Sequence, residues 1–325
     1  MIKIDSSYKY PIFFFALIAL ISFCEISNSA PAVTGTRSNN ACAATVVING
    51  TECEAQPEIQ NIIFHKVAFC TALPTEPTAT TATGMTNCTT VFENTAGATV
   101  SIEKGLGKVP NGTFTDPPYG NYTFAYVELS PVITYKTNLV FNTANALSSN
   151  VAAGQAAGFT NCQTNGTPYF HWGNLFGMTC QNGVGAGAAV ATNTNVTLNS
   201  LSNDGCADMN DVDGVCVIGL YAGRFPGTNG NTDIYLIKSN GALASDSALN
   251  AVASGANAAN AVAKLIAFVP MTAKITPDTT SFNLLYNNTR GMTVWQNNNG
   301  AGNTNNGFFN IGFSVAYFDM TFEVQ

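Results

Sequence analysis

The sequence predicts a mainly β fold, an antiparallel β-sandwich or jelly-roll-like arrangement that is stabilised by disulfides. Three observations predict it. Apolar and polar residues alternate along several segments, as in half-buried strands. Cysteines fall into neighbouring couples behind an export signal, which is typical of local disulfides. Charged residues make up only 10% of the 325 residues, whereas 21 Phe and 11 Tyr can fill a core.

The first thirty residues have the order of a secretory signal peptide. Lys3 and Lys9 precede the apolar run 12–23, and small residues follow as far as Ala32. The run is shorter than the about 20 residues that span a bilayer. Cys24 follows Phe23, not the small residue of lipoprotein signals. We therefore expect residues 1–30 to be removed, with no membrane span left, and the protein to be secreted, at the cell surface or in a periplasm.

The charge of the chain excludes some partners. Residues 1–30 hold as many basic as acidic side chains, so the mature chain keeps the net charge of −7. Nucleic acids and anionic membranes need basic side chains for phosphate neutralisation. Neither is an expected partner. An Asn/Thr/Gly-rich surface with few charges instead favours association with other copies, because charge repulsion is weak.

The cysteines predict a set of local disulfides. Loss of Cys24 leaves eight of the nine cysteines. The simplest pairing joins neighbours, although eight cysteines allow about 105 pairings. No C-x-x-C occurs, so neither a redox site nor a zinc knuckle is supported. The predicted disulfides are Cys42–Cys53, Cys70–Cys88, Cys162–Cys180 and Cys206–Cys216.

Strand patterns dominate the chain. Residues 121–129 place Tyr122, Phe124 and Tyr126 on one face. The segment after Pro131 is expected to be the hairpin partner of this strand. Near the C-terminus the apolar residues are odd-numbered from 309 to 317 and even-numbered from 318 to 324. Such a phase change predicts a long strand that bends near Tyr317, at a bulge or at a crossing between sheets.

One segment, residues 245–266, has helical spacing and predicts a short helix, although its end, 264–270 (KLIAFVP), fits a strand equally well. The Thr/Pro-rich stretch 71–83 is expected to be an exposed loop that Cys70–Cys88 closes. The small-residue stretch 144–158 suggests a boundary. It would divide the mature chain into an N-terminal β domain, 31–145, and a C-terminal β domain, 146–325, unless both form one large domain.

The stretch 203–216 (NDGCADMNDVDGVC) gathers four aspartates between two cysteines. Calcium binds six to eight oxygens from carboxylates, amides and carbonyls. A calcium site is therefore predicted, and its ligands would be Asp208, Asn210, Asp211 and Asp213. The order departs from the EF-hand pattern, because Val212 takes a ligand position and no closing glutamate follows. The alternative is a disulfide-closed turn in which Asp and Asn bond to their own backbone.

The aromatic stretch 168–178 contains the second candidate site. Tyr169, His171 and Trp172 could stack on the apolar face of a sugar. Packing of these rings in the core is the more frequent use of such residues. His65, in the apolar segment 61–69, is expected to be a structural histidine.

No catalytic motif of the common hydrolases or nucleotide-binding enzymes occurs in the chain. The sequence therefore favours a secreted, non-enzymatic structural or adhesive protein of the cell surface that associates with itself. The long apolar C-terminal strand could pair with a neighbouring subunit if it lies at a sheet edge. A calcium-dependent carbohydrate-binding module that recognises surface glycans is the first alternative. A secreted hydrolase with paired carboxylates is the second.

Overall fold

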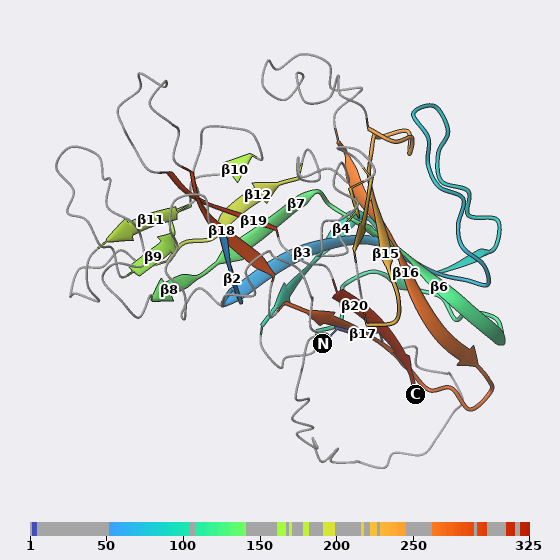
Figure 1. Cartoon of the computed structure of the whole chain (residues 1–325). Helices are drawn as coiled ribbons and strands as arrows, with labels where there is room; N and C mark the ends of the chain where they lie inside the picture. The colour runs from blue at the N-terminus through green and yellow to red at the C-terminus, as the bar shows by residue number, and fades with distance from the viewer. Residues whose placement is uncertain are drawn as a thin grey trace, which may run out of the picture.

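The structure is a computed structural model (Figure 1). It describes residues 2–4, 52–103, 108–140, 161–166, 169–170, 178–181, 191–198, 216–217, 222–225, 228–244, 262–288, 291–297, 310–315 and 319–325. Within these ranges every regular element is a β-strand and no helix occurs. Nearly all strand pairs are antiparallel, with β10 and β12 as a parallel pair. The prediction of a mainly β, antiparallel, disulfide-containing fold is confirmed, while the jelly-roll order stays a prediction.

An 11-stranded sheet forms the body of the described structure. Its path runs in the order β10-β12-β7-β3-β6-β16-β15-β14-β13, and β4 and β5 join it at β3. Its strands are β3 (Ile59–Cys70), β4 (Cys88–Ile102), β5 (Thr113–Phe114), β6 (Gly120–Leu129), β7 (Val132–Lys136), β10 (Tyr169–Phe170), β12 (Thr194–Thr197), β13 (Cys216–Val217), β14 (Ala222–Phe225), β15 (Thr232–Ile237) and β16 (Lys264–Ile275).

Three smaller sheets have three strands each. Their orders are β1-β17-β20, β11-β9-β8 and β19-β18-β2. Their strands are β1 (Ile2–Ile4), β2 (Glu52–Ala55), β8 (Asn138–Val140), β9 (Asn161–Thr164), β11 (Met178–Gln181), β17 (Phe282–Asn287), β18 (Met292–Asn297), β19 (Asn310–Val315) and β20 (Asp319–Val324).

The expected hairpin after Pro131 is wrong. Strand β7 does not pair with β6, but continues it along the same neighbour, β3. Phe64 of β3 lies opposite Leu129 of β6, and Asn61 lies opposite Thr134 of β7. The amide of Ser130 donates to the carbonyl of Ile63 at 2.9 Å, so the junction stays bonded to β3 although a proline, which lacks an amide donor, follows it. The two segments are one bent strand.

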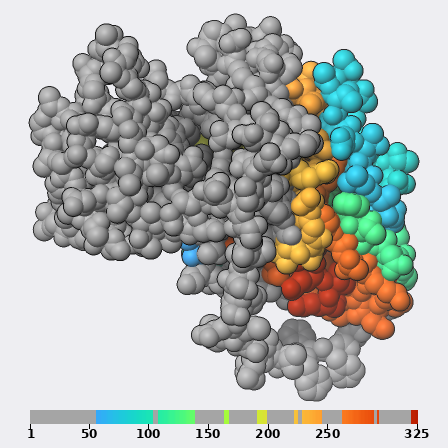
Figure 2. Space-filling model, in the orientation of Figure 1, coloured from blue at the N-terminus to red at the C-terminus, as the bar shows by residue number. Residues whose placement is uncertain are grey.

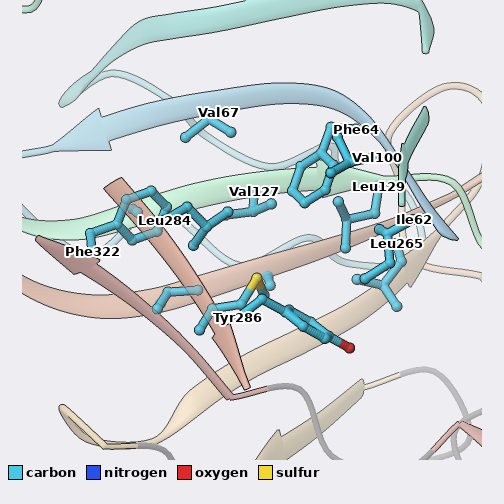
Figure 3. Close-up of a cluster of buried hydrophobic side chains, with 14 of the residues drawn as sticks. Ile62, Phe64, Val67, Val100, Val127, Leu129, Leu265, Leu284, Tyr286 and Phe322 are labelled. Carbon is cyan, nitrogen blue, oxygen red and sulfur yellow. The ribbon is translucent and has the colours of Figure 1, made fainter. Parts of the chain in front are cut away.

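The main core lies between the large sheet and the sheet of β17 and β20 (Figure 3). Phe69 is fully buried there, and its ring lies 4.9 Å from that of Phe282 and 5.6 Å from that of Phe322. Both neighbours belong to the smaller sheet, so Phe69 joins the two sheets. Strands β3, β6 and β16 supply alternating apolar residues to this core, as the period of a strand requires. Its buried members include Ile62, Phe64, Val67, Val100, Val127, Leu129, Leu265, Leu284, Tyr286 and Phe322.

The C-terminal segments on the two sides of Tyr317, which itself lies outside the described residues, pair with different strands. The first half, β19, pairs with β18, and the second half, β20, pairs with β17. The two halves belong to different sheets, so the phase change marks a crossing between sheets. The partner segment is divided in the same way, with Gly291 donating to the carbonyl of Asn288 at 2.9 Å between β17 and β18.

The predicted helix is wrong at its C-terminal end. Residues 264–266 begin β16, which confirms the strand alternative for KLIAFVP. The strand has neighbours on both edges, β15 and β6, and both of its faces are buried, which explains an apolar run without alternation. Residues 245–261 lie outside the described residues. The domain boundary near 144–158 lies outside them as well, and the division at 145 stays a prediction, although β6 and β16 from its two sides are neighbours in one sheet.

Candidate functional site

The face of the large sheet opposite the main core, here called the outer face, has its own smaller core. Its buried members are Ala68, Cys70, Tyr126, Ala222, Tyr235, Ile237, Ile266 and Phe268. The ring of Phe268 lies 5.1 Å from that of Tyr235 and 6.2 Å from that of Tyr126. Strands β6 and β16 therefore contribute buried residues to both faces of the sheet.

A disulfide-closed loop lies over part of the outer face. The Cys70–Cys88 disulfide joins the end of β3 to the start of β4, as predicted. Residues 71–87 are mostly exposed, but Pro74 and Pro77 are buried. The carbonyl of Thr78 accepts from the amide of Leu243 at 2.8 Å, and that of Ala79 accepts from Lys238 Nζ at 2.9 Å. Figure 2 shows this loop, in cyan, beside residues 228–244 in yellow-orange. The disulfide and these bonds fix the predicted exposed loop on the sheet.

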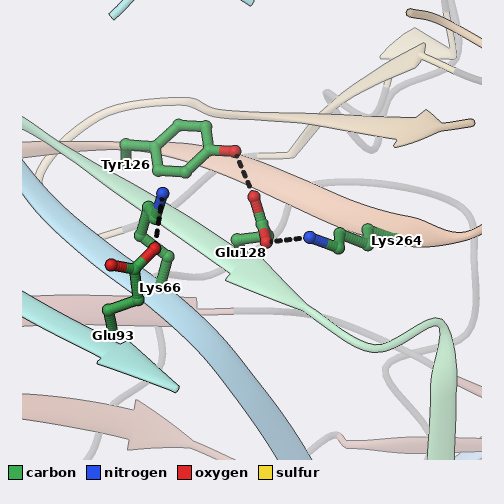
Figure 4. Close-up of polar contacts among 5 residues, drawn as sticks. All are labelled: Lys66, Glu93, Tyr126, Glu128 and Lys264. Atoms are coloured by element: carbon green, nitrogen blue, oxygen red, sulfur yellow. Dashed lines mark hydrogen bonds and ion pairs between the residues drawn. The ribbon is translucent and has the colours of Figure 1, made fainter. Parts of the chain in front are cut away.

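Four charged residues cross the outer face in alternating sign and are here called the charge ladder: Glu93 of β4, Lys66 of β3, Glu128 of β6 and Lys264 of β16 (Figure 4). Lys66 Nζ lies 2.9 Å from Glu93 Oε1. Lys66 is also directly opposite Glu128 in the register of β3 and β6. Glu128 accepts from Lys264 Nζ at 2.5 Å through Oε1 and from the Tyr126 hydroxyl at 2.9 Å through Oε2. Both carboxylate oxygens of Glu128 are therefore occupied.

The electrostatics of the ladder favour a structural use. Burial raises the pKa of Tyr126 well above its ordinary value, and the charge of Glu128 raises it further, so this hydroxyl stays protonated and donates. Farther along the sheet Arg224 donates to both carboxylate oxygens of Asp233. Cross-strand pairs of opposite charge contribute about 0.2–1 kcal/mol each and fix strand register. The ladder can therefore hold four strands in register and leave the face nearly neutral.

A buried polar cluster joins β3, β7 and β17 beside Gly291. Gln60 is fully buried, and its Nε2 donates to the hydroxyls of Tyr135 at 3.2 Å and Tyr286 at 3.0 Å. The Tyr135 hydroxyl donates to the carbonyl of Gly291 at 3.0 Å. A Cβ on Gly291 would lie 3.0 Å from Gln60 Oε1, so glycine permits this close approach. Burial raises the pKa of both tyrosines, which keeps them neutral donors.

Several strands at the edges of sheets have no further partner strand among the described residues. Strand β19 ends the sheet of β18, and β20 ends the sheet of β17. A groove of about 580 Å³ separates β20 from the end of β16 and from Asn229. In Figure 2 the red residues of β20 adjoin the orange residues of β16. The groove is lined partly by Lys274 and Glu323, so charged residues border this edge.

The candidate sites predicted from sequence are largely untested by the structure. Tyr169 lies in β10, directly opposite Val196 of β12. His171 and Trp172 lie outside the described residues, as do Asp208, Asn210, Asp211 and Asp213. Among the residues that are described, no three His, Cys, Asp or Glu side chains form a group that could hold a metal. The sugar platform and the calcium site stay predictions.

The other cysteine couples are placed only in part. Cys162 of β9 and Cys180 of β11 are directly opposite each other in an antiparallel pair, a register that supports their predicted bond. Cys53 lies in β2 and Cys216 in β13, whereas Cys42 and Cys206 lie outside the described residues. These three disulfides stay predictions.

The charge ladder was missed from sequence, although a weak signal for it exists. Lys66 and Glu128 are single charged residues in largely apolar stretches of β3 and β6, and such residues are seldom buried without a partner. His65, expected to be structural, lies where the pairing of β3 with its neighbours shifts register. Its buried Nδ1 has no hydrogen-bond partner within the described part of the chain.

Comparison with known proteins adds no relative. No family model matches the chain, and neither a curated protein nor a solved structure matches it. In the described ranges, no helix is long and apolar enough to cross a membrane.

Proposed function

We propose that this chain is a secreted, non-enzymatic structural or adhesive protein of the cell surface that assembles with itself through its sheet edges. The observation that carries the proposal is the position of the C-terminal strand. Among the described strands both of its halves lie at the ends of three-stranded sheets, and the first half, β19, contains no charged residue, whereas β20 contains Asp319 and Glu323. Edge strands present a row of backbone donors and acceptors that another chain can pair with.

The composition of the edges supports the same function. Proteins that stay monomeric protect edges with lysine, proline or inward charges. Strand β19 (NIGFSV) contains none of these residues. The charged residues of the outer face are instead paired with one another, in the charge ladder and in the Arg224–Asp233 pair. An outer face whose described ion pairs balance in charge, together with the uncharged edge strand β19, favours association at high local concentration.

The test is sedimentation velocity and negative-stain microscopy of residues 31–325 over a wide range of concentration. We expect discrete oligomers, filaments or lattices that grow with concentration. A monomer at every concentration, in calcium and in chelator alike, would refute the assembly function. Assembly in calcium alone would make the predicted Asp208–Asp213 site its switch.

The two alternative functions rest on sequence alone. A calcium-dependent carbohydrate-binding module would use residues of which the structure describes only Tyr169. A glycan array and a calcium titration of the same preparation test this alternative, and activity panels on glycans and esters test the hydrolase.

A further inference from the structure

The edge of β17 is occupied in the structure by the extreme N-terminus of the chain. Strand β1 pairs with β17 antiparallel, with Ile2 opposite Leu284 and Ile4 opposite Phe282. Residues 2–4 belong to the segment that the sequence predicts to be a cleaved signal peptide. If that segment is removed, β17 becomes an edge strand, since β20 is its only other neighbour among the described strands.

We propose that in the mature protein this edge pairs with the β17 edge of a second copy of the chain. The inference rests on the proposed function and adds the β17 edge to the edge of β19 as a surface that joins two copies. The seated β1 strand shows that the edge has room for one more antiparallel strand. An antiparallel pair of identical strands is what a two-fold axis produces, because the same patch then faces itself.

The sequence of β17 (FNLLYN) suits self-pairing. It contains no charge, proline or glycine, and segments of about six residues with this composition pair readily with their own kind. The opposite end of the same sheet differs. Strand β20 carries Asp319 and Glu323, and its outer edge borders the groove that Lys274 also lines. The β17 edge is therefore the unprotected one of the two.

One register matches the chemistry of β17. Centring the two-fold axis on Leu285 sets this residue opposite Leu285 of the second copy. The same register sets Asn283 opposite Asn287 and Leu284 opposite Tyr286 on each side of the axis.

The test compares charged variants of residues 31–325 by sedimentation equilibrium. Leu285→Lys places two lysines directly opposite each other across the axis, and we expect at least a roughly tenfold weaker association. Thr321→Lys is the matched control. Thr321 is half-buried, lies opposite Leu285 on the same face of the sheet, and belongs to β20. The Thr321→Lys variant should associate like the wild type.

A mixture separates edge pairing from a general charge effect. Leu285→Glu alone should associate as weakly as Leu285→Lys, whereas an equimolar mixture of both variants should recover association, because opposite charges then face each other. Recovery supports the pairing. Weakened association that the mixture does not restore, or variants that associate like the wild type, overturn it.

A second measurement on the wild type guards against variants that fail to fold. Backbone amides of 282–287 should exchange with deuterium more slowly at high than at low protein concentration. Exchange in this segment that does not depend on concentration overturns the inference. The proposed function survives that outcome if the protein still assembles, and fails separately if the wild type never associates.

Discussion

Replacing Phe69 with alanine tests whether the two sheets share one core. The Phe69 side chain is fully buried and contacts the rings of Tyr122, Phe282 and Phe322 at centroid distances of 5.7, 4.9 and 5.6 Å. Loss of a buried phenylalanine destabilises a domain by about 3–5 kcal/mol, which combines lost transfer free energy with the cavity left behind. Two of the three ring contacts join the large sheet to the sheet of β17 and β20, so their loss loosens the contact between sheets.

The expected change can be measured as a shift of the unfolding midpoint. A chain of about 300 residues has an unfolding entropy of about 0.6 kcal/mol/K, so 3–5 kcal/mol lowers Tm by roughly 5–8 °C. Differential scanning calorimetry of residues 31–325 and of Phe69→Ala measures this shift. Leu73→Ala is the control, because Leu73 is 45% exposed and its truncation should leave Tm nearly unchanged.

A Tm of Phe69→Ala within about 2 °C of the wild type would correspond to roughly 1 kcal/mol or less. That result would refute the packing of β17 and β20 on the large sheet through Phe69. A single, shifted transition supports one cooperative core, whereas two transitions would mean that the sheets unfold separately.

Three further predictions concern other parts of the structure. Glu128→Gln removes the negative charge that accepts from Lys264 Nζ and from the Tyr126 hydroxyl, so the protein should lose about 0.2–1 kcal/mol of stability for the cross-strand pair; urea unfolding against the wild type measures the loss, and an unchanged midpoint contradicts the ladder. Replacing both Cys70 and Cys88 with alanine should lower the free energy of unfolding by about 3 kcal/mol, because the disulfide closes a loop with a sequence separation of 18. The loss should also speed proteolysis within 71–87, and unchanged cleavage would mean that the hydrogen bonds alone hold the loop. Gly97→Ala should destabilise the fold by more than about 1 kcal/mol, since Gly97 has φ of +89° and a Cβ would lie 2.5 Å from Ile63 Cγ2; urea unfolding with Gly120→Ala, where a Cβ meets nothing within 4 Å, as control measures the effect.

Local sequence patterns predicted the positions of strands better than they predicted which strands pair with each other. The alternation in 121–129 and the phase change near Tyr317 are properties of neighbouring residues, and both are confirmed in β6 and in the division between β19 and β20. The position of β7 depends instead on β3, which lies some seventy residues earlier in the chain. A proline after a strand fits a turn as well as a bend, so sequence alone could not exclude the hairpin.

For the charge ladder, too, the sequence suggests single residues but not their arrangement. A single Glu or Lys in an apolar strand suggests a partner, but the alignment of Glu93, Lys66, Glu128 and Lys264 follows from the register of four strands. The end of the predicted helix was ambiguous for a related reason. A run such as KLIAFVP is apolar throughout because both faces of β16 are covered, and a short buried strand then has no period that separates it from a helix.

The order of strands in the large sheet has a consequence for the folding pathway. Strands β3 and β4 are consecutive and can form a hairpin soon after both are available, but β6 waits for β16, whose Lys264 lies 136 positions beyond Glu128. Pairings of such sequence separation form slowly, because the chain entropy of a long loop is lost before the contact stabilises. The edge of β6 that pairs with β16 therefore stays open until β16 is available. Folding of this protein is thus expected to depend on how well this open edge is kept from pairing with other chains, more than on the stability of the finished core.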